Sequence, residues 1–132
     1  MTAAFFSVLA VLVAMSAANA DYSYVYAGKT VTPLIGETEG VRVNDVCLKD
    51  LGRCHALQVF HGPSHVKEIH HSVDANFSGA YCELLHGTQL FVQNHESNRN
   101  GGSQIQFCVF TDLTMIDAKA LYRSHMKRES GK

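Results

Sequence analysis

Histidines and a glutamate near the middle of the chain are the residues whose types and spacing could bind a metal ion. Imidazole and carboxylate groups are ligands for zinc and copper. The HExxH spacing, which puts two histidines on one helical face, is absent. Two interpretations stay open: a metal site, and an exposed polar segment rich in histidine. The four candidate ligands are His65, Glu68, His70 and His71.

Cysteines are the second group with chemical potential. There are four of them, and an even number in an oxidising compartment favours disulfides over free thiols. Cys54 is followed by a histidine that could activate it as a nucleophile, but a structural disulfide is the favoured interpretation. Four cysteines allow three connectivities, of which we favour Cys47 with Cys54 and Cys82 with Cys108.

Other catalytic signatures are missing from the sequence. Gly62-Pro63-Ser64-His65 lacks the final glycine of a nucleophile elbow. No CxxC motif is present for redox chemistry. Gly101-Gly102 precedes an expected strand and not a helix, so it does not form a phosphate-binding loop. The sequence therefore predicts a non-enzymatic protein without a cofactor.

The first twenty residues predict export. Residues 1–20 hold an almost unbroken apolar run followed by Ala18-Asn19-Ala20, the small-residue pattern that signal peptidase reads. Cleavage there would leave residues 21–132 as a single exported domain, periplasmic or secreted and of bacterial type. We expect no stable membrane insertion, because no second apolar run approaches the length of a membrane helix.

The charge balance limits the partners that the protein can attract. Eleven basic and twelve acidic side chains give no field strong enough to recruit nucleic acid or an anionic membrane. We therefore expect an unknown partner in the envelope or outside the cell, and no nucleic acid.

The first half of the chain contains one clear strand signal. Tyrosines alternate between residues 21 and 27, which is typical of a strand. Pro33 and two glycines favour a connecting loop over residues 30–40. Lys49 to Gly52 resembles a tight turn, so a hairpin would place Cys47 opposite Cys54; a helix is the rival interpretation. Residues 66–73 fit either a strand or a short helix.

The second half predicts the order helix, strand, strand, helix. The first helix is capped by Asp74 or Asn76 and stops at Gly87. A capping box from Thr114 to Asp117 begins the last helix. Both faces of the second strand are partly apolar, so the Cys82 helix covers the side with Cys108, and the final helix or the N-terminal strands cover the other. The strands span residues 89–93 and 104–110, joined by a polar turn over 94–103. The predicted fold class is α+β: a small antiparallel sheet packed with two short helices and stapled by disulfides.

Several motifs in this second half resemble a known family. They are Asn76 to Glu83 with its Tyr81-Cys82 pair, then Gly87, Gly101-Gly102, Cys108-Val109-Phe110, and Ala120 to Arg123. This pattern is similar to a small exported bacterial domain of unknown function that carries the label hemolysin. The resemblance covers about residues 74–124. It implies an exported scaffold and no active site, and we find no long lytic helix that would support lysis.

Together these features predict a non-enzymatic exported binding protein. The polar turn is the expected contact region, because hairpin tips project from a rigid scaffold; an unconstrained surface loop is the competing interpretation. The main alternative is an inhibitor of a secreted hydrolase such as a protease or lysozyme, since a rigid loop lowers the ordering cost of binding. A histidine-based metal binder is the second alternative. The residues expected to bind a partner are Glu96, Arg99 and Asn100.

Overall fold

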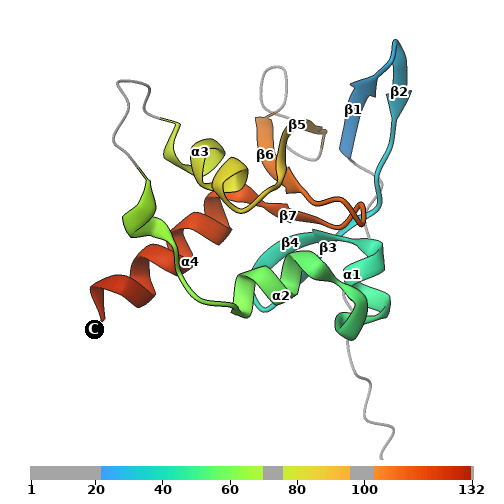
Figure 1. The fold of residues 1–132 in the computed structure, drawn as a ribbon. Coiled ribbons are helices and arrows are strands. Elements are labelled where there is room, and N and C mark those ends of the chain that lie inside the picture. The colour runs from blue at the N-terminus through green and yellow to red at the C-terminus, as the bar shows by residue number, and fades with distance from the viewer. Residues whose placement is uncertain (1–21, 70–75, 96–102, 132) are drawn as a thin grey trace, which may run out of the picture.

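A computed structural model describes residues 22–69, 76–95 and 103–131. The expected signal segment lies outside this part of the chain. The described residues form one antiparallel seven-stranded sheet and four α-helices, so the α+β class is confirmed while the expected two helices are too few (Figure 1). The elements are β1 Tyr22–Tyr26, β2 Lys29–Val31, β3 Ile35–Thr38, β4 Val41–Asn44, α1 Asp45–Lys49, η1 Leu51–Arg53, α2 His55–His61, η2 Val66–Glu68, α3 Phe77–Leu84, β5 Thr88–Asn94, β6 Ser103–Val109, β7 Met115–Asp117 and α4 Ala118–Ser130.

The strands are not arranged in chain order. The sheet runs β2-β1-β5-β6-β7-β4-β3, so the last three strands form its centre and two N-terminal hairpins form its two edges. The β5–β6 ladder is the longest, from Thr88 opposite Val109 to Asn94 opposite Ser103. β7 joins the centre to β4 through the pairing of Ile116 with Val43.

The helices cover one face of the sheet. The larger core lies between them and that face, and its sheet side includes Cys108, Ile116 and Val43. Tyr81 and Cys82 of α3 and Leu121 of α4 bury the helical side of the same core. The expectation that the Cys82 helix covers the Cys108 side of β6 is therefore confirmed, and α4 covers that same side.

The opposite face is closed by the sheet itself. A second core cluster contains Phe107 and Val92 from the central strands together with Tyr22 of β1 and Ile35 of β3. β1 and β3 lie near opposite ends of the strand order, so the sheet must curl to bring them into one cluster. The N-terminal strands, and not the final helix, thus cover this face.

The loop expected over residues 30–40 is largely wrong, because only residues 32–34 form a connecting segment between strands and residues 39–40 form a turn. The rest of the segment belongs to β2 and β3. A two-residue turn joins β1 to β2 and another joins β3 to β4, and both residues of each turn have positive φ, as type I′ hairpins require. β3 is an edge strand, and an edge tolerates a glycine such as Gly36 that packs poorly. The turn residues are Ala27 (φ 50°) and Gly28 (φ 75°), and Glu39 (φ 53°) and Gly40 (φ 77°).

The hairpin expected around Lys49–Gly52 is also wrong, and its helical rival is correct. α1 and η1 precede Cys54, whose sulfur accepts a hydrogen bond from the Leu57 amide at the start of α2. Ala56, Leu57 and Phe60 follow helical spacing and not strand alternation. Of the ambiguous 66–73 segment, only η2 and Ile69 lie in the described residues.

Thr114 does not begin the last helix. Asp117 is the N-cap of α4, and its Oδ1 accepts from the Ala120 amide at 3.1 Å. Thr114 instead accepts from the Ala56 amide at 3.0 Å, and the residues between are the short strand β7. At the start of α3 the prediction of Asn76 as a cap is confirmed, because its side chain accepts from the Gly79 amide. Asp74 lies outside the described residues.

Candidate functional site

All four cysteines are engaged in disulfides. Cys47 is bonded to Cys54 and Cys82 to Cys108, the pairing favoured from the sequence. Every one of these cysteines is fully buried. A thiolate nucleophile at Cys54 is therefore not available in this structure.

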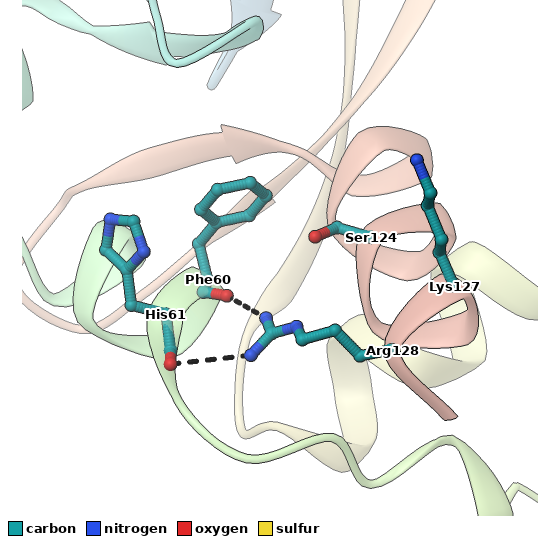
Figure 2. Close-up of a pocket in the computed structure, with 5 residues that line it drawn as sticks. All are labelled: Phe60, His61, Ser124, Lys127 and Arg128. Atoms are coloured by element: carbon teal, nitrogen blue, oxygen red, sulfur yellow. Dashed lines mark hydrogen bonds between the residues drawn. The ribbon is translucent and has the colours of Figure 1, made fainter. Parts of the chain in front are cut away.

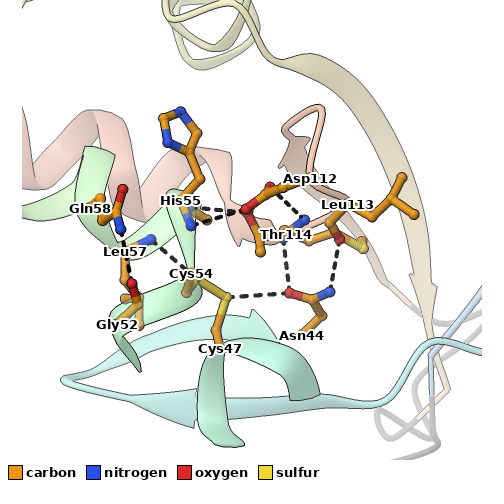
Figure 3. The surroundings of a disulfide bond; sticks show 12 residues. Asn44, Cys47, Gly52, Cys54, His55, Leu57, Gln58, Asp112, Leu113 and Thr114 are labelled. Carbon is orange, nitrogen blue, oxygen red and sulfur yellow. Dashed lines mark hydrogen bonds between the residues drawn. A yellow bond between two sulfur atoms is a disulfide. The ribbon is translucent and has the colours of Figure 1, made fainter. Parts of the chain in front are cut away.

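The surroundings of the first disulfide are a hydrogen-bonded junction (Figure 3). The Asn44 side chain donates to the Leu113 carbonyl at 3.0 Å and accepts from the Met115 amide at 2.9 Å. Burial opposes ionisation of Asp112, but hydrogen bonds from Thr114 and the His55 amide hold the pKa of its carboxyl below the ordinary value. This junction ties α1 and α2 to the β6–β7 turn, and it is structural.

Only part of the predicted metal cluster can be located. His65 Nδ1 lies 2.9 Å from Glu68 Oε2, across one turn of η2. His70 and His71 lie outside the described residues. Within residues 22–69, 76–95 and 103–131, no three histidine, cysteine or acidic side chains gather in a geometry that would hold a metal ion.

The predicted contact residues Glu96, Arg99 and Asn100 also lie outside the described part of the chain. The residues on either side of this turn are part of the sheet, because the β5–β6 ladder extends to the pair Asn94 and Ser103. Just beyond it, His95 Nε2 lies 2.6 Å from Ser23 Oγ of β1. The start of the expected binding loop therefore lies beside the base of the β1–β2 hairpin.

The β1–β2 hairpin rises away from the rest of the sheet (Figure 1). Only the base of β1 pairs with β5, at Tyr22 and Ser23. Towards the tip the side chains become exposed, and Val25 and Tyr26 show 70 % and 72 % of their surfaces to solvent. Because successive side chains of a strand point to opposite faces, the tip exposes Val25 on one face of the hairpin and Tyr26 on the other.

The hairpin tip is a regular two-residue turn. Ala27 and Gly28 form it, with Tyr26 paired to Lys29 across it. Such a type I′ turn matches the twist of the two strands.

Tyr81 and His125 are the only histidine–tyrosine pair described that resembles a proton-transfer arrangement, and both are fully buried. The His65 amide donates to the Tyr81 hydroxyl oxygen at 3.0 Å, and that hydroxyl contacts His125 Nδ1. His125 Nε2 lies 3.1 Å from the Phe60 carbonyl. Since a carbonyl can only accept, Nε2 carries the proton and Nδ1 accepts from the tyrosine.

This chain of hydrogen bonds works with both groups neutral. Burial raises the pKa of Tyr81. Burial, with a smaller contribution from the nearby Arg128 charge, lowers the pKa of His125. Both side chains are shielded from solvent, and their hydrogen bonds link the end of α2 to α3 and α4.

A hollow of about 410 Å³ lies beside the Tyr81–His125 hydrogen bonds, between the end of α2 and the last turns of α4 (Figure 2). Arg128 reaches across it and donates to the carbonyls of Phe60, His61 and Gly62. These are the carbonyls that a helix C-terminus leaves unpaired. Arg128 therefore acts as a cap for α2.

Two features of the molecule were not predicted from the sequence. The hairpin tip was missed because residues 30–40 were expected to form a loop, which left β1 without a following strand, although a glycine such as Gly28 after an alternating run is a hairpin signal. The Tyr81–His125 pair was missed because 44 residues separate its members, and nothing in the local pattern joins them.

The fold and these surfaces define a disulfide-stapled α+β domain that presents a projecting hairpin. Comparison with family models, curated proteins and solved structures finds no match to the chain. Among the described residues, no helix combines the length and apolar character needed to cross a bilayer.

Proposed function

We propose that this protein is a non-enzymatic binding protein exported to the periplasm or the medium, and that it contacts a partner through the β1–β2 hairpin. The observation that carries this proposal is the exposed pair Val25 and Tyr26 on a projecting, well-defined tip. The two disulfides support export, because such bonds persist in oxidising compartments. We further propose that residues 74–124 are related to the hemolysin-labelled exported domain, although no family model matches the chain.

The hairpin extends the contact region expected from the sequence. Its base adjoins His95, which leads into the turn with Glu96, Arg99 and Asn100. Apolar contact at the tip would supply affinity, since exposed tyrosine is among the residues that dominate interface energies.

Site-specific crosslinking tests this proposal. A photoreactive amino acid at position 26 should capture a discrete extracytoplasmic protein, whereas the same group at position 51 should not. Leu51 is a matched control because it is also exposed, at 58 %, and lies in η1 away from the hairpin. Equal capture from both positions would remove the hairpin from the proposal.

Substitution gives a second, independent reading. The double variant Val25→Ser, Tyr26→Ser should abolish partner binding. It should change the melting temperature only slightly, as substitutions of exposed residues usually do. Leu51→Ser with Met126→Ser removes two exposed apolar side chains elsewhere, 58 % and 45 % exposed, and should bind normally. Binding by the hairpin variant at wild-type affinity would contradict the proposal.

Inhibition of a secreted hydrolase is the second candidate, and the hairpin favours it specifically. A rigid tip that projects beyond the domain suits insertion into an enzyme cleft, and preorganised loops bind tightly because they lose little entropy. Steady-state assays of lysozyme and of serine, cysteine and metalloproteases with purified protein should show stoichiometric inhibition of one class. No inhibition in any of these assays would exclude this candidate.

Metal binding through His65, Glu68, His70 and His71 remains a third proposal. The contact between His65 and Glu68 brings two of the four ligands together. Calorimetric titration with zinc and copper should show stoichiometric heat that His65→Gln abolishes. The absence of that heat would remove the proposal, and intact red cells at micromolar protein would likewise remove a lytic role.

A further inference from the structure

A second hollow, separate from the hairpin, lies where the sheet opens around the start of α4. β7 ends at Asp117, so residues 103–106 of β6 pair with β5 on one side and with no strand of the described chain on the other. The resulting hollow has a volume of about 360 Å³ and lies between β4, β6 and the first turns of α4.

Three cationic side chains from two elements line this hollow. Arg42 comes from β4, and Lys119 and Arg123 come from successive turns of α4. Gln104 of β6 adds a neutral amide to the wall. The spacing of four residues places Lys119 and Arg123 on one side of the helix, one above the other.

The single carboxylate of the hollow is already engaged. Asp117 Oδ2 lies 3.6 Å from Arg42 Nη1, and its Oδ1 accepts from the Ala120 amide. In the described part of the chain, the side chains of Lys119, Arg123 and Gln104 make no hydrogen bond or ion pair.

The residues that line the hollow carry two more positive than negative charges, in a chain whose formal net charge is −1. Glu37 of β3 lies opposite Arg42 in the β3–β4 ladder and outside this lining. This excess comes from side chains and not from the helix terminus, because the capping residue already occupies the Ala120 amide. Lys119 and Arg123 are exposed to solvent, so water and salt screen their mutual repulsion. An anion bound between them would be attracted by both charges. The contacts within the fold give no reason for Lys119 and Arg123 to lie in the same hollow as Arg42.

We infer that this hollow binds an oxyanion, in the form of a phosphate or sulfate group carried by a small molecule. Guanidinium groups match the geometry of such groups with paired N–H donors, and an ammonium adds a point charge. The volume is at the lower end of the range for small-ligand pockets, so it holds the oxyanion and a small part of the molecule that bears it. Arg42 stays oriented by Asp117 while Lys119 and Arg123 close on the ligand.

Nuclear magnetic resonance titration of the full chain tests this inference. Sodium phosphate and sodium sulfate are added in separate series, with sodium chloride used to keep the ionic strength constant, so that general screening is not counted as binding. Saturable shifts are expected at the amides of residues 40–42, 104–106 and 117–123. Shifts that grow linearly with anion concentration, or that chloride reproduces, would overturn the inference.

Matched variants locate the effect. Lys119→Gln with Arg123→Gln should weaken binding by at least about tenfold, which corresponds to roughly 1.4 kcal/mol. Lys49→Gln with Arg53→Gln removes one lysine and one arginine from exposed positions elsewhere, and it should bind as the wild type does. Equal weakening by both pairs would show a nonspecific charge effect and would overturn the site.

Two further ligands distinguish the source of the oxyanion. Glucose 6-phosphate and N-acetylglucosamine 6-sulfate are titrated beside the corresponding unesterified sugars. Saturable binding of either ester that its free sugar does not reproduce supports the site and names the group it prefers. Failure of both esters to bind would refute it. Because the hairpin residues are unchanged in these variants, the outcome is independent of partner binding through β1–β2.

Discussion

Replacing Tyr81 by phenylalanine tests the buried chain that runs from the His65 amide through His125 to the Phe60 carbonyl. The change removes one oxygen atom and keeps the ring that packs in the core. His125 Nδ1 then loses its donor in a site with no exposure to solvent. The His65 amide loses its acceptor as well.

The expected cost follows from these two lost partners. A buried polar group without a partner costs about 1–3 kcal/mol. The hydrogen bond of His65 is only part-buried, so that amide can recover water. We therefore expect Tyr81→Phe to lower the free energy of unfolding by about 2–3 kcal/mol, a large part of the roughly 5–15 kcal/mol typical of a domain.

Tyr122→Phe is the matched control. Tyr122 packs edge-on against Tyr81 at 5.8 Å between ring centroids and stacks on Phe77. Its hydroxyl makes no hydrogen bond within the described residues. Its loss should change the free energy of unfolding by no more than about 0.5 kcal/mol.

The measurement is urea unfolding at neutral pH with both disulfides intact, followed by circular dichroism. The slope of free energy against urea should be the same for all three proteins, so that a shift in midpoint reports stability. Equal midpoints for Tyr81→Phe and Tyr122→Phe would refute the assignment of the buried hydroxyl as a necessary partner of His125.

Three more predictions follow from the core. Burial lowers the pKa of His125 in the folded protein. The contribution of neutral His125 to the free energy of unfolding is therefore complete above the pKa of unfolded histidine, about 6.5, and declines as the pH falls below that pKa. The difference in free energy of unfolding between wild type and His125→Gln should narrow from about pH 7.5 to about pH 5, and a constant difference would contradict this. Gly87→Ala places a Cβ against both sulfurs of the second disulfide, at 2.9 Å from the Cys82 sulfur, and should cost about 1–3 kcal/mol in urea unfolding, whereas Gly131→Ala, whose Cβ meets only ordinary contacts, should not. Replacing Cys82 and Cys108 by alanine should cost roughly 3 kcal/mol, and an unchanged unfolding midpoint would exclude a stabilising role for that bond.

Local patterns predicted the elements that depend on local signals. The tyrosine alternation gave β1, the alternating runs gave β5 and β6, and Asn76 was readable as a cap because its hydrogen bond spans three residues. The Cys82–Cys108 pair followed from the expected packing of that helix on the strand, whereas the Cys47–Cys54 pair was predicted from a hairpin where the structure has α1 and η1.

The missed elements depend on contacts between distant residues. β7 has three residues, and it is a strand because it fills the space between β6 and β4. Asn44 shows the same dependence: it precedes α1, but its side chain makes no cap because it bonds the backbone at Leu113 and Met115.

The candidate sites likewise combine residues that a local pattern indicates with residues that only the tertiary fold brings to them. Lys119 and Arg123 are visible as a helical pair in the sequence, but Arg42 joins them only when β4 pairs with β7. The exposed tip of β1 was hidden because its tyrosine pattern is also that of a buried strand. Tyr22 is buried and Tyr26 is exposed in the same strand because β5 ends beside the base of β1. The sequence around the tyrosines does not indicate where β5 ends.

The strand order has a consequence for when the molecule can fold. Both N-terminal hairpins attach to strands that come later in the chain, β1 to β5 and β4 to β7. While the chain is still emerging, neither hairpin has its neighbour, and an isolated two-stranded hairpin is only marginally stable in water. Cooperative folding therefore waits for the final quarter of the polypeptide, and such long-range pairing is slow. A chain that stays unfolded until its last residues arrive would suit the export that we propose, because an unfolded chain can pass through a narrow channel.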